Sequence, residues 1–269
     1  MKEAQKIFDR LWSDYTTQNP EVKKVYDSFV AKGEEVLNDH IAFRTFDDPK
    51  VNIDVIARPF IKAGYEFRNS YVFEQKRLRA RHFEHKTFRD APRVFISELM
   101  TSDFSPYLQE KVNEIIAKIP DTIINNDELV FSGNVWGKPS YEVYQHLRDE
   151  SEYAAWLYVY GFRANHFTVS INGLKNYDTI EKVNQFLKDN GFMLNDSGGE
   201  IKGTPAELLE QSSTKAGILT VDFIEGKHDI PSCYYEFARR YLDADGKIYS
   251  GFIAKSADKI FESTDFYKK

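Results

Sequence analysis

The chain has 269 residues, of which 42% are hydrophobic and 15% aromatic, so it can bury a large core and is not a disordered chain. Its formal net charge of -6 argues against a dedicated nucleic-acid binder, which needs a concentrated positive face. Its single cysteine, Cys233, excludes an internal disulfide and a thiolate metal cluster, so any bound metal must use imidazole and carboxylate ligands.

The N-terminal part of the chain predicts helices followed by a strand-rich segment. Residues 2–33 have the apolar spacing of helices on both sides of a break at Asn19-Pro20. After a first strand over 38–46, Asp48-Pro49 predicts a helix start, because an N-cap residue precedes a proline at the first helical position. The strands that follow are predicted near 71–86 and at 93–100.

The second half of the chain repeats this plan. A histidine begins each first strand, at His40 and His166, and a carboxylate lies in a later strand, at Glu98 and Glu236. A helix-like stretch ending in a glycine and an aromatic residue separates each pair. This weak repeat predicts an α+β fold, with two strand-helix-strands modules in one compact domain. Its parts are a helical cover (1–34), a first module (35–100), a helical insertion (101–163), a second module (164–245) and a tail (246–269) expected to pack on the body.

The histidines and Glu236 have the chemistry of a metal site. Two neutral imidazoles and one carboxylate suit a divalent first-row metal and leave positions open for a chelating substrate and O2. An isolated histidine at a strand start is more often a hydrogen-bonded core residue, but the matched positions of His40 and His166 in the repeat favour a metal. Glu98, the counterpart of Glu236, is a further candidate ligand.

Arg44 is a candidate for substrate binding. Positions 40, 42 and 44 share one face of the first strand, so Arg44 points the same way as His40. A planar guanidinium matches the far carboxylate of a substrate whose near end chelates the metal. The alternative is a salt bridge with Asp47 or Asp48.

Two further histidines occur in the stretch Arg79 to His85. Strand alternation sends His82 and Glu84 to one face and His85 to the other, so the two histidines cannot easily share one ion. We therefore expect a solvated polar strand here rather than a second metal site.

Three segments of the chain resemble the 2-oxoadipate dioxygenase/decarboxylase family. They are Asp39-His40-Ile41-Ala42-Phe43-Arg44-Thr45-Phe46, Asn165-His166-Phe167-Thr168 and Tyr234-Tyr235-Glu236-Phe237. The resemblance covers residues 35 to 245, and the His-x-x-x-Arg element is its most specific part. The family is related in fold to vicinal oxygen chelate proteins, which implies a curved or barrel-like sheet around a metal. By this likeness His40, His166 and Glu236 would bind Fe(II), and Arg44 would hold the distal carboxylate of the substrate; no role carries over to Glu98.

The resemblance also implies a reaction. An Fe(II)-dependent dioxygenase of this family would convert 2-oxoadipate, or a similar 2-oxo acid, and O2 to 2-hydroxyglutarate and CO2. The substrate supplies its own reducing electrons, so no separate 2-oxoglutarate is required. Lysine catabolism is the pathway that the resemblance suggests.

Three alternatives stay open at this point. A vicinal-oxygen-chelate isomerase or lyase would use a redox-silent metal, and Glu98 as a fourth ligand would favour it. An extradiol-type dioxygenase would share Fe(II) but need no anion clamp, and a non-enzymatic binding module would hold no tight metal. The chain shows neither a signal-peptide core nor an apolar stretch long enough to cross a bilayer. We therefore expect a cytoplasmic protein with small-molecule partners and no nucleic-acid or membrane partner.

Overall fold

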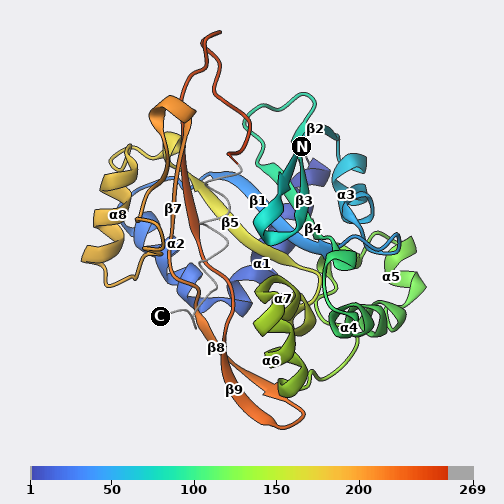
Figure 1. Cartoon of the computed structure of the whole chain (residues 1–269). Helices are drawn as coiled ribbons and strands as arrows, with labels where there is room; N and C mark the ends of the chain where they lie inside the picture. Colours follow the sequence, from blue (N-terminus) through green and yellow to red (C-terminus); the bar gives the residue numbers. More distant parts are fainter. Residues whose placement is uncertain (1, 254–269) are drawn as a thin grey trace. The chain divides into compact units, whose positions relative to one another are not determined.

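The computed structural model describes residues 2–253 (Figure 1), so most of the predicted tail, residues 254–269, lies outside the described residues. The chain divides into two compact units, each assembled from segments that are distant in the sequence. Unit 1 comprises Met1–Tyr15, Ala42–Asn165 and Ile218–Ile230, and unit 2 comprises Thr16–Ile41, His166–Gly217 and Pro231–Lys269, as far as these are described. Elements α1, β1, β5 and β9 cross the boundaries between these segments.

Unit 1 contains a sheet with the strand order β2-β3-β4-β1 and a separate β8-β9 hairpin. The strands are β1 (Asn38–Phe46), β2 (Tyr65–Phe73), β3 (Leu78–His85), β4 (Arg93–Leu99), β8 (Ile218–Phe223) and β9 (Gly226–Pro231). The helices are α1 (Lys2–Gln18), α3 (Ile53–Lys62), α4 (Pro106–Ala117), α5 (Asp121–Asn125), α6 (Tyr141–Glu150) and α7 (Glu152–Tyr160).

Unit 2 continues from β1 with the strand order β1-β5-β10-β7-β6. The strands are β5 (Ala164–Ser170), β6 (Lys202–Thr204), β7 (Leu209–Ser213) and β10 (Glu236–Arg240), and the helices are α2 (Pro20–Ala31) and α8 (Ile180–Asp189). Strand β10 pairs parallel to β5 and antiparallel to β7. Short 3-10 turns lie at Glu74–Lys76, Thr101–Asp103, Leu129–Phe131, Ile171–Gly173 and Pro205–Glu207.

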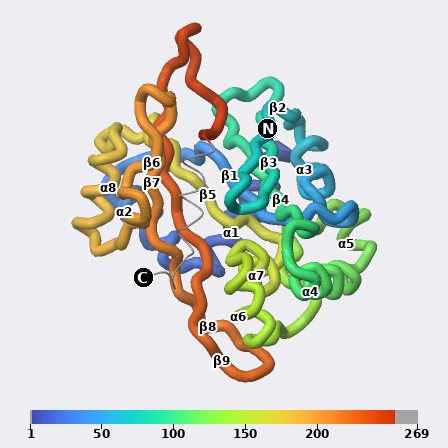
Figure 2. Tube along the Cα trace, in the orientation of Figure 1, coloured from blue at the N-terminus to red at the C-terminus, as the bar shows by residue number. Residues whose placement is uncertain are grey.

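Two helices form on either side of the Asn19-Pro20 break, and they bury the residues that helical spacing predicts. Helix α1 ends at Gln18 and α2 begins at Pro20, because proline lacks the N–H that a continuous helix needs but fits the first helical turn. In unit 1, Phe8 of α1 packs against Phe60, with ring centroids 6.2 Å apart. In unit 2, α2 and α8 lie side by side (Figure 2), and the rings of Phe29 and Phe186 are 4.4 Å apart.

The predicted helix start at Asp48-Pro49 is wrong. Helix α3 begins four residues later, at Ile53, where the side chain of Asn52 accepts a hydrogen bond from the N–H of Val55 at 3.2 Å. The Asp48 side chain instead accepts from the N–H of Lys50 at 2.8 Å. A carboxylate that bonds the backbone two residues on forms a turn, so it cannot cap the helix.

The α+β class is confirmed, although β10 is shorter than its sequence pattern indicates. The run from Ser232 to Tyr235 precedes the strand, which begins at Glu236. Its backbone bonds a loop instead, since Ser232 N–H donates to Gly217 O at 2.8 Å. No helix among residues 2–253 is both long and apolar enough to cross a membrane.

Candidate metal centre

Three neighbouring strands of unit 2 carry the predicted ligands. His40 lies on β1, His166 on β5 and Glu236 on β10, and these strands are adjacent in the order β1-β5-β10. The parallel register places Glu236 opposite Thr168, which shares a strand face with His166. The three side chains therefore converge from separate strands, and all three are buried.

The spacing of the donor atoms suits one metal ion. The Nε2 atom of His40 lies 3.4 Å from Glu236 Oε1, and the Nε2 atom of His166 lies 3.3 Å from Glu236 Oε2. Two donors that each bind a metal at about 2.1 Å, with an angle between right and tetrahedral, lie about 3.0–3.4 Å apart. Within the described residues, this is the group of three histidine, cysteine or acidic side chains whose ligand atoms lie within 4.8 Å of one another.

The electrostatics of Glu236 also favour a cation. Burial is the main cause that raises the pKa of this carboxyl group to about 8, and the nearby charge of Asp39 acts in the same direction. A hydrogen bond from Gln211 and the charge of Arg240 act in the opposite direction. A buried carboxylate between two imidazoles is stabilised in its charged form by a bound cation. The donor set therefore fits a divalent metal on its chemistry, its spacing and its charge.

Neighbouring polar groups hold these ligands in place. The hydroxyl group of Thr168 lies 3.1 Å from His40 Nε2, and the side-chain amide of Gln211 donates to Glu236 Oε1 at 2.5 Å. Sequence patterns did not identify Thr168 or Gln211, because each contacts a residue on a neighbouring strand. These contacts exist only once the strands have paired in the folded sheet. The ring of Tyr234 stacks on that of His166, with centroids 4.7 Å apart.

Arg44 is a buried cation on β1. Its side chain is 2% exposed, and its guanidinium carbon lies 4.9 Å from the ring centre of Tyr153 and 5.3 Å from that of Trp156. Its Nε and Nη1 atoms have no hydrogen-bond partner among the described residues. The alternative salt bridge with Asp47 or Asp48 is not among the ion pairs of the described residues. Buried N–H donors of a charged group are costly to leave unpaired, so this guanidinium is suited to an anionic ligand.

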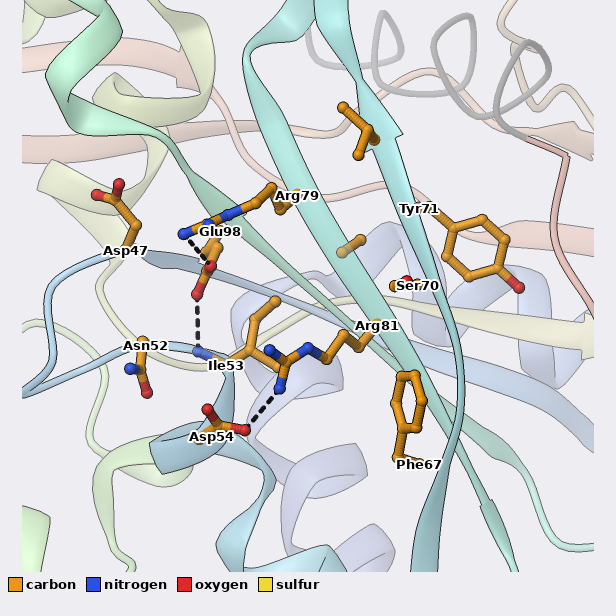
Figure 3. A pocket seen from close by; sticks show the side chains of 12 residues that line it. Asp47, Asn52, Ile53, Asp54, Phe67, Ser70, Tyr71, Arg79, Arg81 and Glu98 are labelled. Atoms are coloured by element: carbon orange, nitrogen blue, oxygen red, sulfur yellow. Dashed lines mark hydrogen bonds and ion pairs between the residues drawn. The ribbon is translucent and has the colours of Figure 1, made fainter.

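Glu98 lies in unit 1, and its two oxygens are occupied by protein groups (Figure 3). Its Oε2 atom accepts the N–H of Ile53 at 3.0 Å, and its Oε1 atom pairs with Arg79 Nη2 at 2.9 Å. Glu98 thus caps the first turn of α3, where a negative charge is favourable. It also lines a cavity of about 570 Å³. The cluster of potential metal ligands does not include it.

The expectation of a solvated strand around His82 and His85 is wrong, since both side chains are buried. Strand β3 lies between β2 and β4, and the rings of Tyr71 and Tyr65 on β2 contact those of His82 and His85, respectively. His82 contacts Tyr71 Oη through Nδ1 at 2.9 Å and Glu84 through Nε2 at 3.1 Å. His85 accepts from the N–H of Thr87 at 3.2 Å, and burial lowers its pKa.

Known proteins are similar in sequence to this one over nearly the whole chain. The family model of 2-oxoadipate dioxygenase/decarboxylase matches residues 7–246. The rice (Oryza sativa subsp. japonica) 2-oxoadipate dioxygenase/decarboxylase of chloroplasts and amyloplasts is 36% identical, over 93% of this chain and 75% of its own length.

Solved structures agree with the sequence comparisons. A crystal structure of hydroxyglutarate synthase from Oryza sativa in complex with 2-oxoadipate has a TM-score of 0.91 at 34% identity, over 99% of this chain and 94% of that one. A Shewanella frigidimarina NCIMB 400 protein has a TM-score of 0.88 at 47% identity, over 93% of this chain and 98% of that one.

A more distant structure relates the fold to the glyoxalase superfamily. A protein of Ralstonia eutropha JMP134 assigned to that superfamily has a TM-score of 0.75 at 19% identity, over 93% of this chain and 85% of that one. This likeness concerns the fold alone, and it agrees with the predicted fold class. Together with the match of the family model over most of the sequence, the comparisons establish that the chain belongs to the 2-oxoadipate dioxygenase/decarboxylase family.

Proposed function

We propose that this protein is an Fe(II)-dependent dioxygenase that converts 2-oxoadipate and O2 to 2-hydroxyglutarate and CO2. The observation that carries the proposal is the buried convergence of His40, His166 and Glu236, a donor set typical of non-heme Fe(II) oxygenases. Membership of the family and the 2-oxoadipate bound in the rice relative support the choice of substrate. Lysine catabolism and a cytoplasmic location remain predictions of the sequence.

In this proposal the three side chains hold the metal and leave positions open. The Nε2 atoms of His40 and His166 and one oxygen of Glu236 are the ligands, because these atoms face one another at metal-compatible spacing. Bound Fe(II) would supply a redox-active centre for O2 and a chelation point for the 2-oxo acid. The burial of all three residues keeps bulk water from the site and strengthens its electrostatics.

Arg44 is proposed to orient the substrate. It follows His40 by four residues on β1, so both side chains leave the same face of the strand. The faces of Tyr153 and Trp156 hold the guanidinium without using its N–H donors, which remain available to a carboxylate. In this proposal Arg44 binds the distal carboxylate of the substrate.

The test is a turnover experiment with defined metal and oxygen. Metal-free protein is loaded anaerobically with Fe(II), mixed with 2-oxoadipate with or without O2, and followed by oxygen uptake and by mass spectrometry of the products. We expect one CO2 and one 2-hydroxyglutarate for each O2 consumed, and loss of turnover in His40→Ala and Glu236→Ala.

Other outcomes would point to the other functions. Turnover of a substrate without O2 and with a redox-silent metal would indicate an isomerase or lyase. Ring cleavage of catechols would indicate an extradiol-type enzyme. The absence of both metal binding and turnover of any 2-oxo acid would refute the proposal.

A further inference from the structure

Asp39 joins a proposed metal ligand to a buried arginine in unit 2. Its Oδ1 atom lies 2.8 Å from His40 Nδ1 and accepts a hydrogen bond from Arg240 Nη2 at 2.9 Å. Its Oδ2 atom accepts from Arg240 Nε at 2.7 Å. All three side chains are buried, and the guanidinium pairs bidentately with the carboxylate.

This pairing determines which nitrogen of His40 carries the hydrogen atom. A carboxylate held by two guanidinium N–H groups is an acceptor, so the hydrogen of the contact with His40 lies on Nδ1. The lone pair is then on Nε2, the atom that faces Glu236 and Thr168. Ligating histidines are commonly oriented by such an outer carboxylate, which fixes the tautomer and the ring.

The same arginine holds a segment near the end of the described chain. Arg240 Nη1 donates to the carbonyl oxygens of Tyr249 at 3.0 Å and Gly251 at 2.7 Å. The next residue, Phe252, is buried and presents its ring to that of His40 in an edge-to-face contact at 4.8 Å. The guanidinium carbon of Arg240 also lies 5.1 Å from the centre of the Phe252 ring.

Arg240 is itself fixed in position. It lies on β10, four residues after Glu236, and its backbone forms two hydrogen bonds with the side chain of Asn172, at 2.9 and 2.8 Å. Its guanidinium therefore makes four hydrogen bonds, two to a carboxylate and two to backbone carbonyls.

We propose that Arg240 is a positioning residue for the metal site. Through Asp39 it holds His40 in the tautomer whose Nε2 atom can be a ligand. Through the carbonyl groups of Tyr249 and Gly251 it holds Phe252 against the imidazole ring and keeps water from that side. The inference rests on the metal site of the proposed function but not on its substrate.

The tautomer is tested in the metal-free full-length chain labelled with 15N-histidine, by long-range 15N–1H spectra of the imidazoles. We expect His40 to carry its hydrogen on Nδ1. In Asp39→Asn one carboxylate oxygen becomes an NH2 group. Because Oδ1 contacts both His40 and Arg240 and Oδ2 contacts Arg240, this NH2 group opposes an N–H donor in either orientation. The contact with Nδ1 should therefore weaken, and the hydrogen should shift to Nε2. Affinity for Co(II), used as the probe and measured by calorimetry, should then fall about 10- to 100-fold.

Glu34→Gln is the matched control for this variant. Glu34 is also a buried carboxylate of unit 2, but it accepts from the backbone N–H groups of Lys175 and Asn176. The Glu34→Gln variant should leave the tautomer of His40 and the Co(II) affinity unchanged. Wild-type His40 with its hydrogen on Nε2, or an Asp39→Asn variant with unchanged tautomer and affinity, overturns the proposal.

The second part of the proposal, that Arg240 holds the segment Tyr249–Phe252, is tested with Arg240→Lys. An ammonium group cannot make both the bidentate contact and the two carbonyl contacts, so amide hydrogen exchange should speed up in peptides that contain Tyr249–Phe252. Arg239→Lys is the control, because this neighbour lies over the ring of Tyr241 instead. If amide hydrogen exchange in these peptides is unchanged in Arg240→Lys, this part of the proposal is overturned.

The outcomes separate this inference from the proposed function. If the wild-type protein passes the tautomer and exchange tests and binds Co(II) but does not turn over 2-oxoadipate, only the proposed function fails. If it turns over 2-oxoadipate but the variants change neither tautomer nor exchange, only this inference fails. Wild-type protein that binds no Co(II) at all overturns the metal site and this inference together.

Discussion

Glu98 and Glu236 occupy equivalent places in the two halves of the chain and have different surroundings. Both are buried carboxylates on strands that follow the helix of their half. Glu98 accepts from a helix N-terminus and pairs with Arg79, which is 53% exposed. Glu236 accepts from the amide of Gln211 and faces two imidazoles. Position in a repeat therefore places a carboxylate on a strand, but its neighbours determine its chemistry.

The helix starts account for part of this difference. Helix α3 is capped by Asn52 and receives a second acceptor from Glu98 at the N–H of Ile53. Helix α8 is capped by the side chain of Thr179, which accepts from the N–H of Lys182 at 3.2 Å. In the first half the strand carboxylate is used to stabilise a helix, whereas Glu236 remains directed at the histidines.

Exchanging each carboxylate for its amide gives the largest expected contrast. Glu236→Gln should lower kcat/KM for 2-oxoadipate more than about 100-fold, because loss of a ligand exceeds the usual effect of an outer partner. Glu98→Gln should retain iron and most of the activity. Oxygen uptake and iron content measure both variants. An equal loss of iron in the two variants would indicate that Glu98 is also a ligand. It would favour the alternative of a vicinal-oxygen-chelate isomerase or lyase with a redox-silent metal.

A second contrast concerns two arginines on strands. Arg44→Ala should raise KM for 2-oxoadipate about 100-fold at unchanged iron content, because it removes a buried donor pair from a carboxylate. Arg79→Ala, which removes an arginine already paired with Glu98, should leave KM unchanged. Steady-state kinetics and metal analysis measure both. Loss of iron with retained substrate affinity in Arg44→Ala would contradict the assigned role.

The convergence of His40, His166 and Glu236 was predictable from the sequence, whereas the contacts that support them were not. His40 and His166 begin strands of the same pattern, and strand alternation assigns their side chains to one face. The pairing of Asp39 with Arg240 joins residues 201 positions apart, and local periodicity carries no record of it. The start of α3 was misplaced for a related reason, because Asp48 is an adequate cap in isolation but bonds within a turn.

The pH dependence of stability should also separate the two carboxylates. In the folded, metal-free protein the pKa of Glu236 is raised from 4.5 to about 8, so the fold favours the protonated, neutral carboxyl group. The stability that this group contributes is fully present below pH 4.5 and is lost as the pH rises through about 8. Relative to wild type, Glu236→Gln should therefore gain stability between pH 5 and 9, on the order of 4 kcal/mol. Urea unfolding with a chelator present measures the difference. A gap that does not change with pH would contradict the raised pKa.

The smallest expected effect belongs to Glu98. Replacing it by glutamine keeps an oxygen for the N–H of Ile53 but removes the charge that favours the start of α3 and pairs with Arg79. Because Arg79 is half exposed, solvent screens that ion pair, and the loss should be about 1 kcal/mol. Urea midpoints should fall accordingly, and addition of Co(II) should stabilise this variant as much as wild type. A Co(II)-dependent stabilisation that disappears in Glu98→Gln would place this carboxylate in the metal site after all.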